Sequence, residues 1–242
     1  MSELIMVLGP AGHGKSTSIR ALNPENTYII NCMGKRLPFP DAKKYKEDPS
    51  KIGLKGNICA TGNPTAILKI CENISEKRPD IKNLIIDDLS YVMVQTYVSS
   101  RNEKDQWEKF NRIAYFIWDL LQGANQLREG LNVIVISHLD SDGKDTVVGG
   151  AQLGMKTVGK FTRDKINPEG LSTIILVPII ERKGGQATYF YITQADRLNP
   201  ARSPIDMFPY EIPCDLGVVV DRLAEYENEI PLSESKVNFE LS

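Results

Sequence analysis

Histidine, cysteine and tryptophan are scarce in this 242-residue chain, which has two, four and two of them, respectively. The cysteines, at positions 32, 59, 71 and 214, form no CxxC pair, and only two histidines could join them as metal ligands, so a zinc site is not expected. Four cysteines in a chain of this length also do not suggest a disulfide framework. The charges nearly cancel, with 29 Lys and Arg against 31 Asp and Glu, which excludes a strongly basic coat protein of nucleic acid but allows a local basic patch.

Long apolar runs are also missing. No stretch approaches the roughly 18 residues that a membrane-spanning helix needs. The apolar run at positions 4–8 is too short for the core of a signal peptide and has no basic flank. We therefore expect a cytoplasmic protein without a membrane partner.

The remaining composition is that of a globular protein, with 41% hydrophobic and 25% charged residues. A chain of this length corresponds to one large domain, predicted here over residues 1–220. Residues 221–242 contain six Asp or Glu against two Lys or Arg and are expected to form an acidic C-terminal tail. Disordered solvation is the simplest interpretation of this tail; competition with DNA for basic loops and recruitment of a partner are the alternatives.

Apolar runs alternate with helical patterns along the chain. Strands are predicted at 4–8, 27–31, 83–87, 131–137, 173–180 and 188–193, and helices at 15–22, 63–76 and 103–126. The last helix carries Trp107 and Trp118, for which core packing is expected. A Gly-Gly turn at 184–185 predicts a hairpin between the last two strands. The pattern predicts an α/β fold with a mainly parallel sheet and an antiparallel C-terminal hairpin.

Residues 9–16, GPAGHGKS, match the phosphate-loop pattern GxxxxGK[ST] between a strand and a helix. Glycines let the backbone wrap a phosphate, and successive N–H groups with the helix N-terminus supply positive potential. Lys15 is expected to reach the β- and γ-phosphates of ATP, and the Ser16 hydroxyl to ligate Mg²⁺; His13 has no assigned chemistry. The positions expected to contact the nucleotide are Gly9, Pro10, Ala11, Gly12, His13, Gly14, Lys15, Ser16 and Thr17.

Two acids end the predicted strand 83–87. Asp87 closes a buried apolar run, as in a Walker B strand, and is expected to hold Mg²⁺ mostly through water. Asp88 follows it, where P-loop ATPases that activate water often carry the general base. A helix or turn cap is the alternative interpretation of Asp88.

His138 ends the strand predicted at 131–137. Ligands of open α/β sheets bind at the carboxyl ends of the strands. His138 is therefore a candidate sensor of the γ-phosphate that passes the nucleotide state to the Gly-rich loop 139–170. A capping or surface histidine is the alternative.

The order of these elements resembles the RecA-like ATPase core, and more narrowly the short phage-encoded RecA-like proteins implicated in single-strand annealing and recombination. The blocks that carry the narrower resemblance are Gly34-Lys35-Arg36-Leu37-Pro38-Phe39, Lys156-Thr157-Val158-Gly159-Lys160 and Ala201-Arg202-Ser203-Pro204. The resemblance covers residues 3 to 210, and it implies a three-layer α/β fold of the P-loop NTPase type with a RecA-like core. It implies an ATPase that forms a homo-oligomeric ring or filament, with ATP at subunit interfaces and single-stranded DNA as the partner.

The resemblance also implies roles for basic residues. In RecA-like proteins a neighbouring subunit inserts a Lys or Arg toward the γ-phosphate, and Arg202, less so Arg197, occupies the matching stretch here. The loop after the sensor strand would bind DNA through Lys156, Lys160 and Arg163, since positions 156–165 carry four Lys or Arg against one Asp. A solvated surface is the alternative in both places.

The chain departs from full RecA proteins after the strand 27–31, where Asn31-Cys32-Met33 offers no catalytic glutamate. Either Asp88 substitutes, or hydrolysis is slow and ATP acts mainly as an assembly switch. A basic lid is predicted at 33–57, since positions 32–56 hold seven Lys or Arg against three acids. Phe39 and Tyr45 lie among them, so the lid is either solvated or a surface on which bases stack.

Two other functions stay open. A P-loop kinase for a small molecule would share the phosphate loop, although such kinases usually carry an Arg-rich lid. An assembly or packaging ATPase would use the same core on a protein partner and not act on DNA directly.

Overall fold

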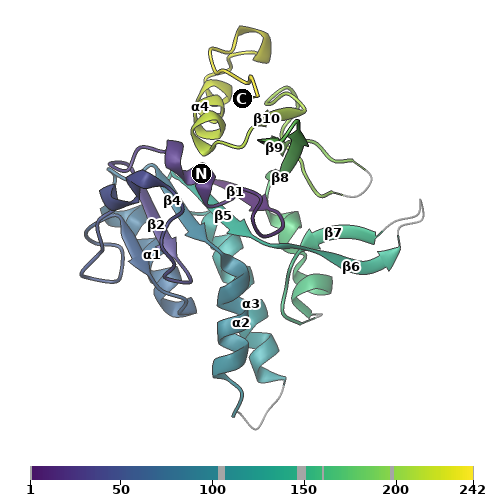
Figure 1. The fold of residues 1–242 in the computed structure, drawn as a ribbon. Coiled ribbons are helices and arrows are strands. Elements are labelled where there is room, and N and C mark those ends of the chain that lie inside the picture. The colour runs from purple at the N-terminus through teal and green to yellow at the C-terminus, as the bar shows by residue number, and fades with distance from the viewer. Residues whose placement is uncertain (1, 103–106, 146–150, 160, 197–198, 242) are drawn as a thin grey trace.

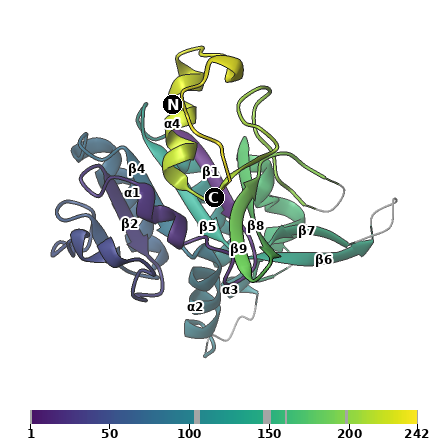
Figure 2. The same ribbon diagram turned by 45° about the horizontal axis from the view of Figure 1, so that its top comes forward.

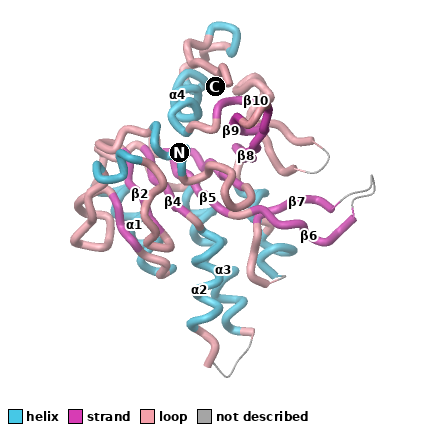
Figure 3. The backbone as a smooth tube through the Cα atoms, viewed as in Figure 1, coloured by secondary structure: helices cyan, strands magenta, loops and turns pink. Residues whose placement is uncertain are grey.

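The computed structural model of the chain describes residues 2–102, 107–145, 151–159, 161–196 and 199–241, and is built around one eight-stranded sheet (Figures 1 and 3). The strand order is β10-β9-β8-β1-β5-β4-β2-β3, and a second sheet pairs β6 with β7. All pairs from β8 to β3 are parallel, whereas β8, β9 and β10 pair antiparallel. The predicted fold class is therefore confirmed.

The strands are β1 (Glu3–Leu8), β2 (Thr27–Asn31), β3 (Ile58–Ala60), β4 (Asn83–Asp87), β5 (Asn132–Ser137), β6 (Leu139–Asp145), β7 (Ala151–Met155), β8 (Ile174–Lys183), β9 (Gln186–Ile192) and β10 (Glu211–Pro213). The α-helices are α1 (Pro64–Lys77), α2 (Leu89–Ser99), α3 (Glu108–Ala124) and α4 (Leu216–Glu227). Short helical turns are η1 (Thr17–Ala21), η2 (Pro40–Lys44), η3 (Thr162–Ile166), η4 (Pro168–Leu171) and η5 (Leu232–Glu234).

Each central strand supplies side chains to two cores, because successive residues of a strand point to opposite faces. In β1, Leu4, Met6 and Leu8 pack into the core beneath α1, α2 and α3. Ile5 and Val7 pack into the core on the other face, with residues of η1 and α4. The sheet is thus the middle layer of three (Figure 2).

The predicted helix 15–22 is replaced by the five-residue turn η1. Ser18 Oγ donates a 2.6 Å hydrogen bond to the carbonyl oxygen of Lys15, and so competes with the backbone for the acceptor that a longer helix would use. Pro24 lies shortly after the turn and cannot continue a helix. The phosphate loop is therefore not followed by a full α-helix. The helix predicted at 63–76 is observed as α1, and the Asn63 side chain caps it by accepting from Ala66 N.

Trp107 and Trp118 do not pack in the core, contrary to expectation. Their exposed fractions are 77% and 43%, because α3 turns its other face to the sheet. Tyr115, also exposed, lies on the same outer side of the helix. The adjacent helix α2 was not predicted, since it contains no charged residue and has little helical periodicity. Figure 1 shows α2 and α3 projecting together beyond the sheet.

The segment 33–57 is docked on the sheet and is not a freely solvated lid. Leu37, Phe39 and Tyr45 are buried in the core shared with α4, so the two aromatic rings cannot stack on bases. Asp48 is fully buried and accepts hydrogen bonds from Tyr28 Oη at 2.9 Å and Gly53 N at 2.7 Å. This carboxylate ties the segment to β2.

The described parts of the segment 139–170 contain two strands and two short helical turns. Its first part forms the β6–β7 hairpin, which projects from the body of the molecule in Figure 1. The predicted hairpin of β8 and β9 is also present, and Gly184 and Gly185 take the positive φ angles of 59° and 86° that its two-residue turn requires.

The predicted boundary at residue 220 falls inside α4, and the acidic segment beyond it is anchored to the rest of the protein by hydrogen bonds. Arg222 is fully buried and donates to the carbonyl oxygens of Met207 and Ile230 at 2.7 and 3.0 Å. Glu225 accepts hydrogen bonds from Ser235 and from Lys236 N.

Among the described residues, no helix combines the length and the apolar character needed to cross a bilayer.

Candidate functional site

The carboxyl ends of β1, β5, β4 and β2 converge at one edge of the sheet. In the parallel register Leu8 pairs with Ser137, and Asp87 pairs with Ile136 on one side and with Asn31 on the other. The chain that leaves each strand therefore emerges at the same edge, where such sheets bind ligands.

The phosphate loop leaves β1 at this edge. Gly12 and Gly14 have φ angles of 80° and 83°, a conformation that side chains with a Cβ rarely adopt and that turns successive N–H groups toward one point. Lys15 is buried, and its Nζ donates to the carbonyl oxygens of Gly9 and Pro10, each at 2.8 Å. Burial lowers the pKa of Lys15, while the carboxylates of Asp88 and Asp87 act in the opposite direction.

Ser16 and Asp87 meet as the motif predicts. Ser16 Oγ donates to Asp87 Oδ1 at 2.8 Å. Burial raises the pKa of Asp87 to about 6, although the hydrogen bond from Ser16 and the charges of Lys15 and Lys35 act to lower it. A hydroxyl and a carboxylate at this separation are hard oxygen donors of the kind that Mg²⁺ prefers.

Asp88 and His138 form a second pair. Asp88 Oδ2 lies 3.1 Å from His138 Nε2, and the Oδ1 atom is buried without a hydrogen-bond partner among the described residues. Asp88 stands at the start of α2 with a φ of 76°, but its side chain makes no capping hydrogen bond within the described part of the chain. Asp88 thus occupies the N-cap position, but its side chain does not cap the helix.

The position of His138 is set by hydrogen bonds to α2. The backbone N–H of His138 donates to Ser90 Oγ at 3.0 Å, and Ser90 Oγ lies 2.7 Å from Ser137 Oγ. The Tyr91 ring meets the imidazole edge-on, with centroids 5.8 Å apart. The imidazole is held between α2 and the carboxylate of Asp88 and is not a freely solvated side chain.

A cavity of about 510 Å³ lies over the phosphate loop, a size that suits a nucleotide. Arg20 and Lys35 add two cations to Lys15, whereas Asp88 is the carboxylate in its lining. Tyr91 and Tyr189 supply aromatic surface on different sides of the loop. The excess of positive charge fits a polyphosphate, and the oxygens of Ser16 and Asp87 fit its magnesium ion.

Four of these lining residues were not predicted: Arg20, Lys35, Tyr91 and Tyr189. They come from η1, from the segment after β2, from α2 and from β9, and their convergence depends on the sheet order. The sequence carried a signal only for Lys35, which lies in the block 34–39.

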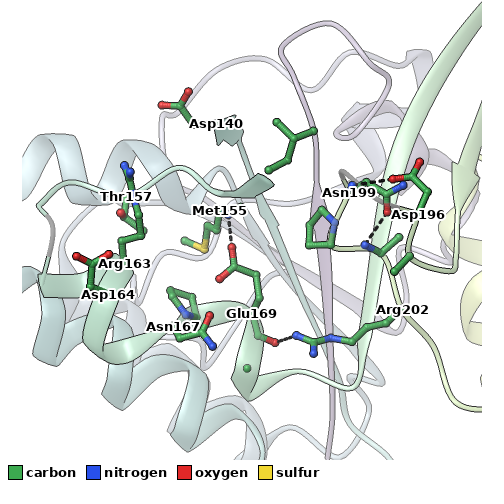
Figure 4. Close-up of a pocket in the computed structure, with 17 residues that line it drawn as sticks. Asp140, Met155, Thr157, Arg163, Asp164, Asn167, Glu169, Asp196, Asn199 and Arg202 are labelled. Atoms are coloured by element: carbon green, nitrogen blue, oxygen red, sulfur yellow. Dashed lines mark hydrogen bonds between the residues drawn. The ribbon is translucent and has the colours of Figure 1, made fainter. Parts of the chain in front are cut away.

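Arg202 is not in the lining of this cavity. It pairs with Ile175 of β8 through two backbone hydrogen bonds, and its side chain is exposed and donates to the carbonyl oxygen of Glu169. It lines a separate cavity of about 550 Å³, at the opposite end from Arg163 (Figure 4). Arg202 is therefore not part of the phosphate-loop cavity of its own chain. Arg197 lies outside the described residues.

The predicted DNA-binding residues are not gathered on one surface. Lys156 is exposed beside the phosphate-loop side of α2, and its backbone N–H donates to His138 O at 2.7 Å. Arg163 faces the other cavity with Asp164, and Lys160 lies outside the described residues. Lys156 is therefore linked directly to His138, whereas a continuous basic patch is not evident in the described part of this loop.

No protein-family model matches the chain, and no curated protein is similar to it. Among solved structures the chain is similar to a KaiC-like protein of the hyperthermophilic archaeon Pyrococcus horikoshii, with a TM-score of 0.44 and 11% identity. The alignment covers 81% of this chain and 80% of that one. A likeness at this level says nothing about what either protein binds, so the chemistry of the site depends on the geometry above.

Proposed function

We propose that the protein binds ATP with Mg²⁺ over the phosphate loop and hydrolyses it. The observation that carries this proposal is the hydrogen bond between Ser16 and Asp87, in the same cavity region as Lys15 and the Asp88–His138 pair. Phosphoryl transfer to water needs two ligands for the metal ion, a lysine that binds the phosphates and a carboxylate that orients the water.

Each residue then has a distinct role. The N–H groups of the loop and Lys15 would bind the β- and γ-phosphates, and Ser16 and Asp87 would hold Mg²⁺, whose charge offsets that of the phosphates when it is bound. Asp88 is assigned as the general base, because its buried Oδ1 is free to accept a proton from water. His138 holds the other carboxylate oxygen and so fixes the direction in which Oδ1 points.

We further propose that the nucleotide state reaches the loop 156–165 and controls binding of single-stranded DNA. The hydrogen bond from Lys156 N to His138 O supports this coupling, since any shift of the sensor strand end moves the start of the basic loop. Few phosphate contacts per subunit give weak binding, so repetition along a homo-oligomer would supply the affinity. Arg202 of a neighbouring subunit would then complete the ATP site in a phage recombination or annealing protein.

Electron microscopy with a non-hydrolysable ATP analogue, with and without single-stranded DNA, tests the assembly. Rings or filaments that need both ligands are expected. Unchanged monomers under all conditions would contradict the assembly proposal. Rings that form equally well without DNA would favour an assembly ATPase that acts on a protein. In parallel, release of phosphate from ATP tests the enzyme itself, whereas transfer of phosphate to a nucleoside or metabolite would point to a kinase.

A further inference from the structure

Lys35 stands at the end of β2, on the edge where the phosphate loop lies. The turn that carries it is held by two hydrogen bonds: Asn31 Nδ2 donates to Lys35 O at 2.6 Å, and Gly34 N donates to Asn31 O at 3.2 Å. Leu37 and Phe39 are buried in the core directly after it. The backbone at Lys35 is thus anchored on both sides, although its side chain is exposed.

The side chain lines the phosphate-loop cavity. Lys35 Nζ lies 4.7 Å from the centroid of the Tyr91 ring, and the same ring packs edge-on against His138. The ammonium group is also close enough to Asp87 for its charge to act on that carboxylate. Lys35 therefore belongs to the same rim as the metal-binding and base positions.

The order of the sheet divides this cavity into two rims. Lys35, Asp88 and His138 follow β2, β4 and β5, which lie on one side of β1. Tyr189 belongs to β9, on the other side of β1. Because Asp87 would hold the metal ion on the first rim, we expect the terminal phosphate of a bound nucleotide on that rim and its nucleoside near Tyr189.

The negative charge on the first rim means that Lys15 alone would offset little of the charge of a terminal phosphate. Asp87 and Asp88 place two carboxylates where the terminal phosphate would add further negative charge, and Lys15 Nζ is already shared with two carbonyl oxygens. A bound diphosphate would place no phosphate at this rim, so a cation there would add little to the affinity for a diphosphate. A triphosphate meets the cation directly.

We propose that Lys35 contacts the terminal phosphate from the same chain and sets the preference of the site for a nucleoside triphosphate over a diphosphate. This inference rests on the proposed nucleotide site and gives a role to the block 34–39. It also means that one subunit supplies two cations to the terminal phosphate before any neighbour contributes Arg202.

The test compares Lys35→Ala, Lys35→Arg and the control Arg36→Ala, whose side chain is exposed next in sequence but does not line the cavity. Affinities for a non-hydrolysable ATP analogue and for ADP are measured with Mg²⁺ by calorimetry. Lys35→Ala is expected to lower triphosphate affinity by about 10- to 100-fold while ADP affinity stays the same. Lys35→Arg should restore most of the preference, and Arg36→Ala should keep all of it.

Other outcomes overturn the inference in distinguishable ways. If the wild-type protein binds both nucleotides and Lys35→Ala changes both affinities equally, or neither, Lys35 does not set the preference and the proposed ATP site stands. If the wild-type protein binds neither nucleotide, the proposed function fails and this inference fails with it. Thermal unfolding of each variant shows that the folds are comparable.

Discussion

The hydroxyl of Ser16 donates a 2.8 Å hydrogen bond to Oδ1 of Asp87, across 71 positions of sequence. The contact exists because β5 separates β1 from β4 and all three strands are parallel, so the loop after β1 reaches over to the end of β4. The same arrangement brings Asp88 and His138 together. The site is therefore a consequence of the sheet order as much as of the motif.

Replacement of Lys15 by alanine is expected to abolish ATP binding and leave the fold intact. Among the described residues, the Nζ atom donates to the carbonyl oxygens of Gly9 and Pro10, so its loss removes charge from the phosphate site without opening the core. A fall in affinity of about 100-fold or more is expected for a charged contact to two phosphates. Calorimetric titration with ATP and thermal unfolding measure the two effects.

Lys43→Ala is a control for the removal of one positive charge, since Lys43 is exposed and lines a different cavity. It should bind ATP as the wild-type protein does. Retained ATP affinity in Lys15→Ala would count against the assignment of residues 9–16 as a phosphate loop.

Arg202→Ala is expected to lose hydrolysis while it retains ATP binding. Arg202 lies outside the phosphate-loop cavity of its own chain, so the proposed role is to stabilise the transition state in a neighbouring subunit. A fall of about 10³-fold in turnover is expected if the arginine acts in this way. Arg182→Ala, an exposed arginine of the β8–β9 hairpin, is the matched control. Undiminished turnover would remove Arg202 from the site.

The strands could be predicted because their signals are local. The runs at 27–31 and 83–87 are observed with the same bounds, since buried parallel strands are apolar on both faces. The phosphate loop and Asp87 were also predictable, because each is defined by a short motif at a strand end. The register that joins them was not needed for those predictions.

What could not be predicted depends on contacts between distant segments. Asp48 is charged and looked like part of a solvated lid, but Tyr28 of β2 binds it in the interior. Trp107 was expected to pack in the core, but it precedes the first residue of α3 and its side chain is exposed. Lys35 lies in the phosphate-loop cavity because of the order of β2, β4 and β5 in the sheet, which the sequence does not reveal.

Asp88→Asn tests the general base. Asparagine tolerates the left-handed conformation that residue 88 adopts, with a φ of 76°, so the start of α2 should be unchanged. An amide cannot accept the proton of the attacking water, and turnover should fall by about 10²- to 10⁴-fold with ATP affinity kept. Steady-state phosphate release and nucleotide titration are the measurements. Full activity in this variant would show that hydrolysis needs no carboxylate at residue 88.

The exposure of the two tryptophans can be measured directly. Trp107 and Trp118 are the two tryptophans of the chain, with exposed fractions of 77% and 43%. Acrylamide should quench the emission of both efficiently, and more strongly in Trp118→Phe, which keeps only Trp107, than in Trp107→Phe. Neither variant should unfold at a lower temperature by more than a few degrees. Blue-shifted, protected emission would contradict the position of α3.

The carboxylate of Asp48 is expected to make a large, pH-dependent contribution to stability. Burial acts to raise the pKa of this group, but the hydrogen bonds it accepts outweigh burial, and its pKa is lowered. Asp48→Ala would leave the Tyr28 hydroxyl and the Gly53 N–H without an acceptor, and should lower the free energy of unfolding by about 2–5 kcal/mol. Tyr28→Phe, which removes one of these hydrogen bonds, should cost about 1 kcal/mol.

The sign of the pH dependence follows from the lowered pKa. The folded state binds the Asp48 proton more weakly than the unfolded chain, so the stabilisation is complete above the unfolded value of about 4 and is lost as the pH falls through the folded value. Urea unfolding at neutral pH and at about pH 3 should therefore show a difference between wild type and Asp48→Asn that shrinks in acid. Asp41→Asn is the control, because Asp41 forms an exposed pair with Lys44 and should show little difference at either pH. A gap between wild type and Asp48→Asn that widens in acid would contradict the lowered pKa.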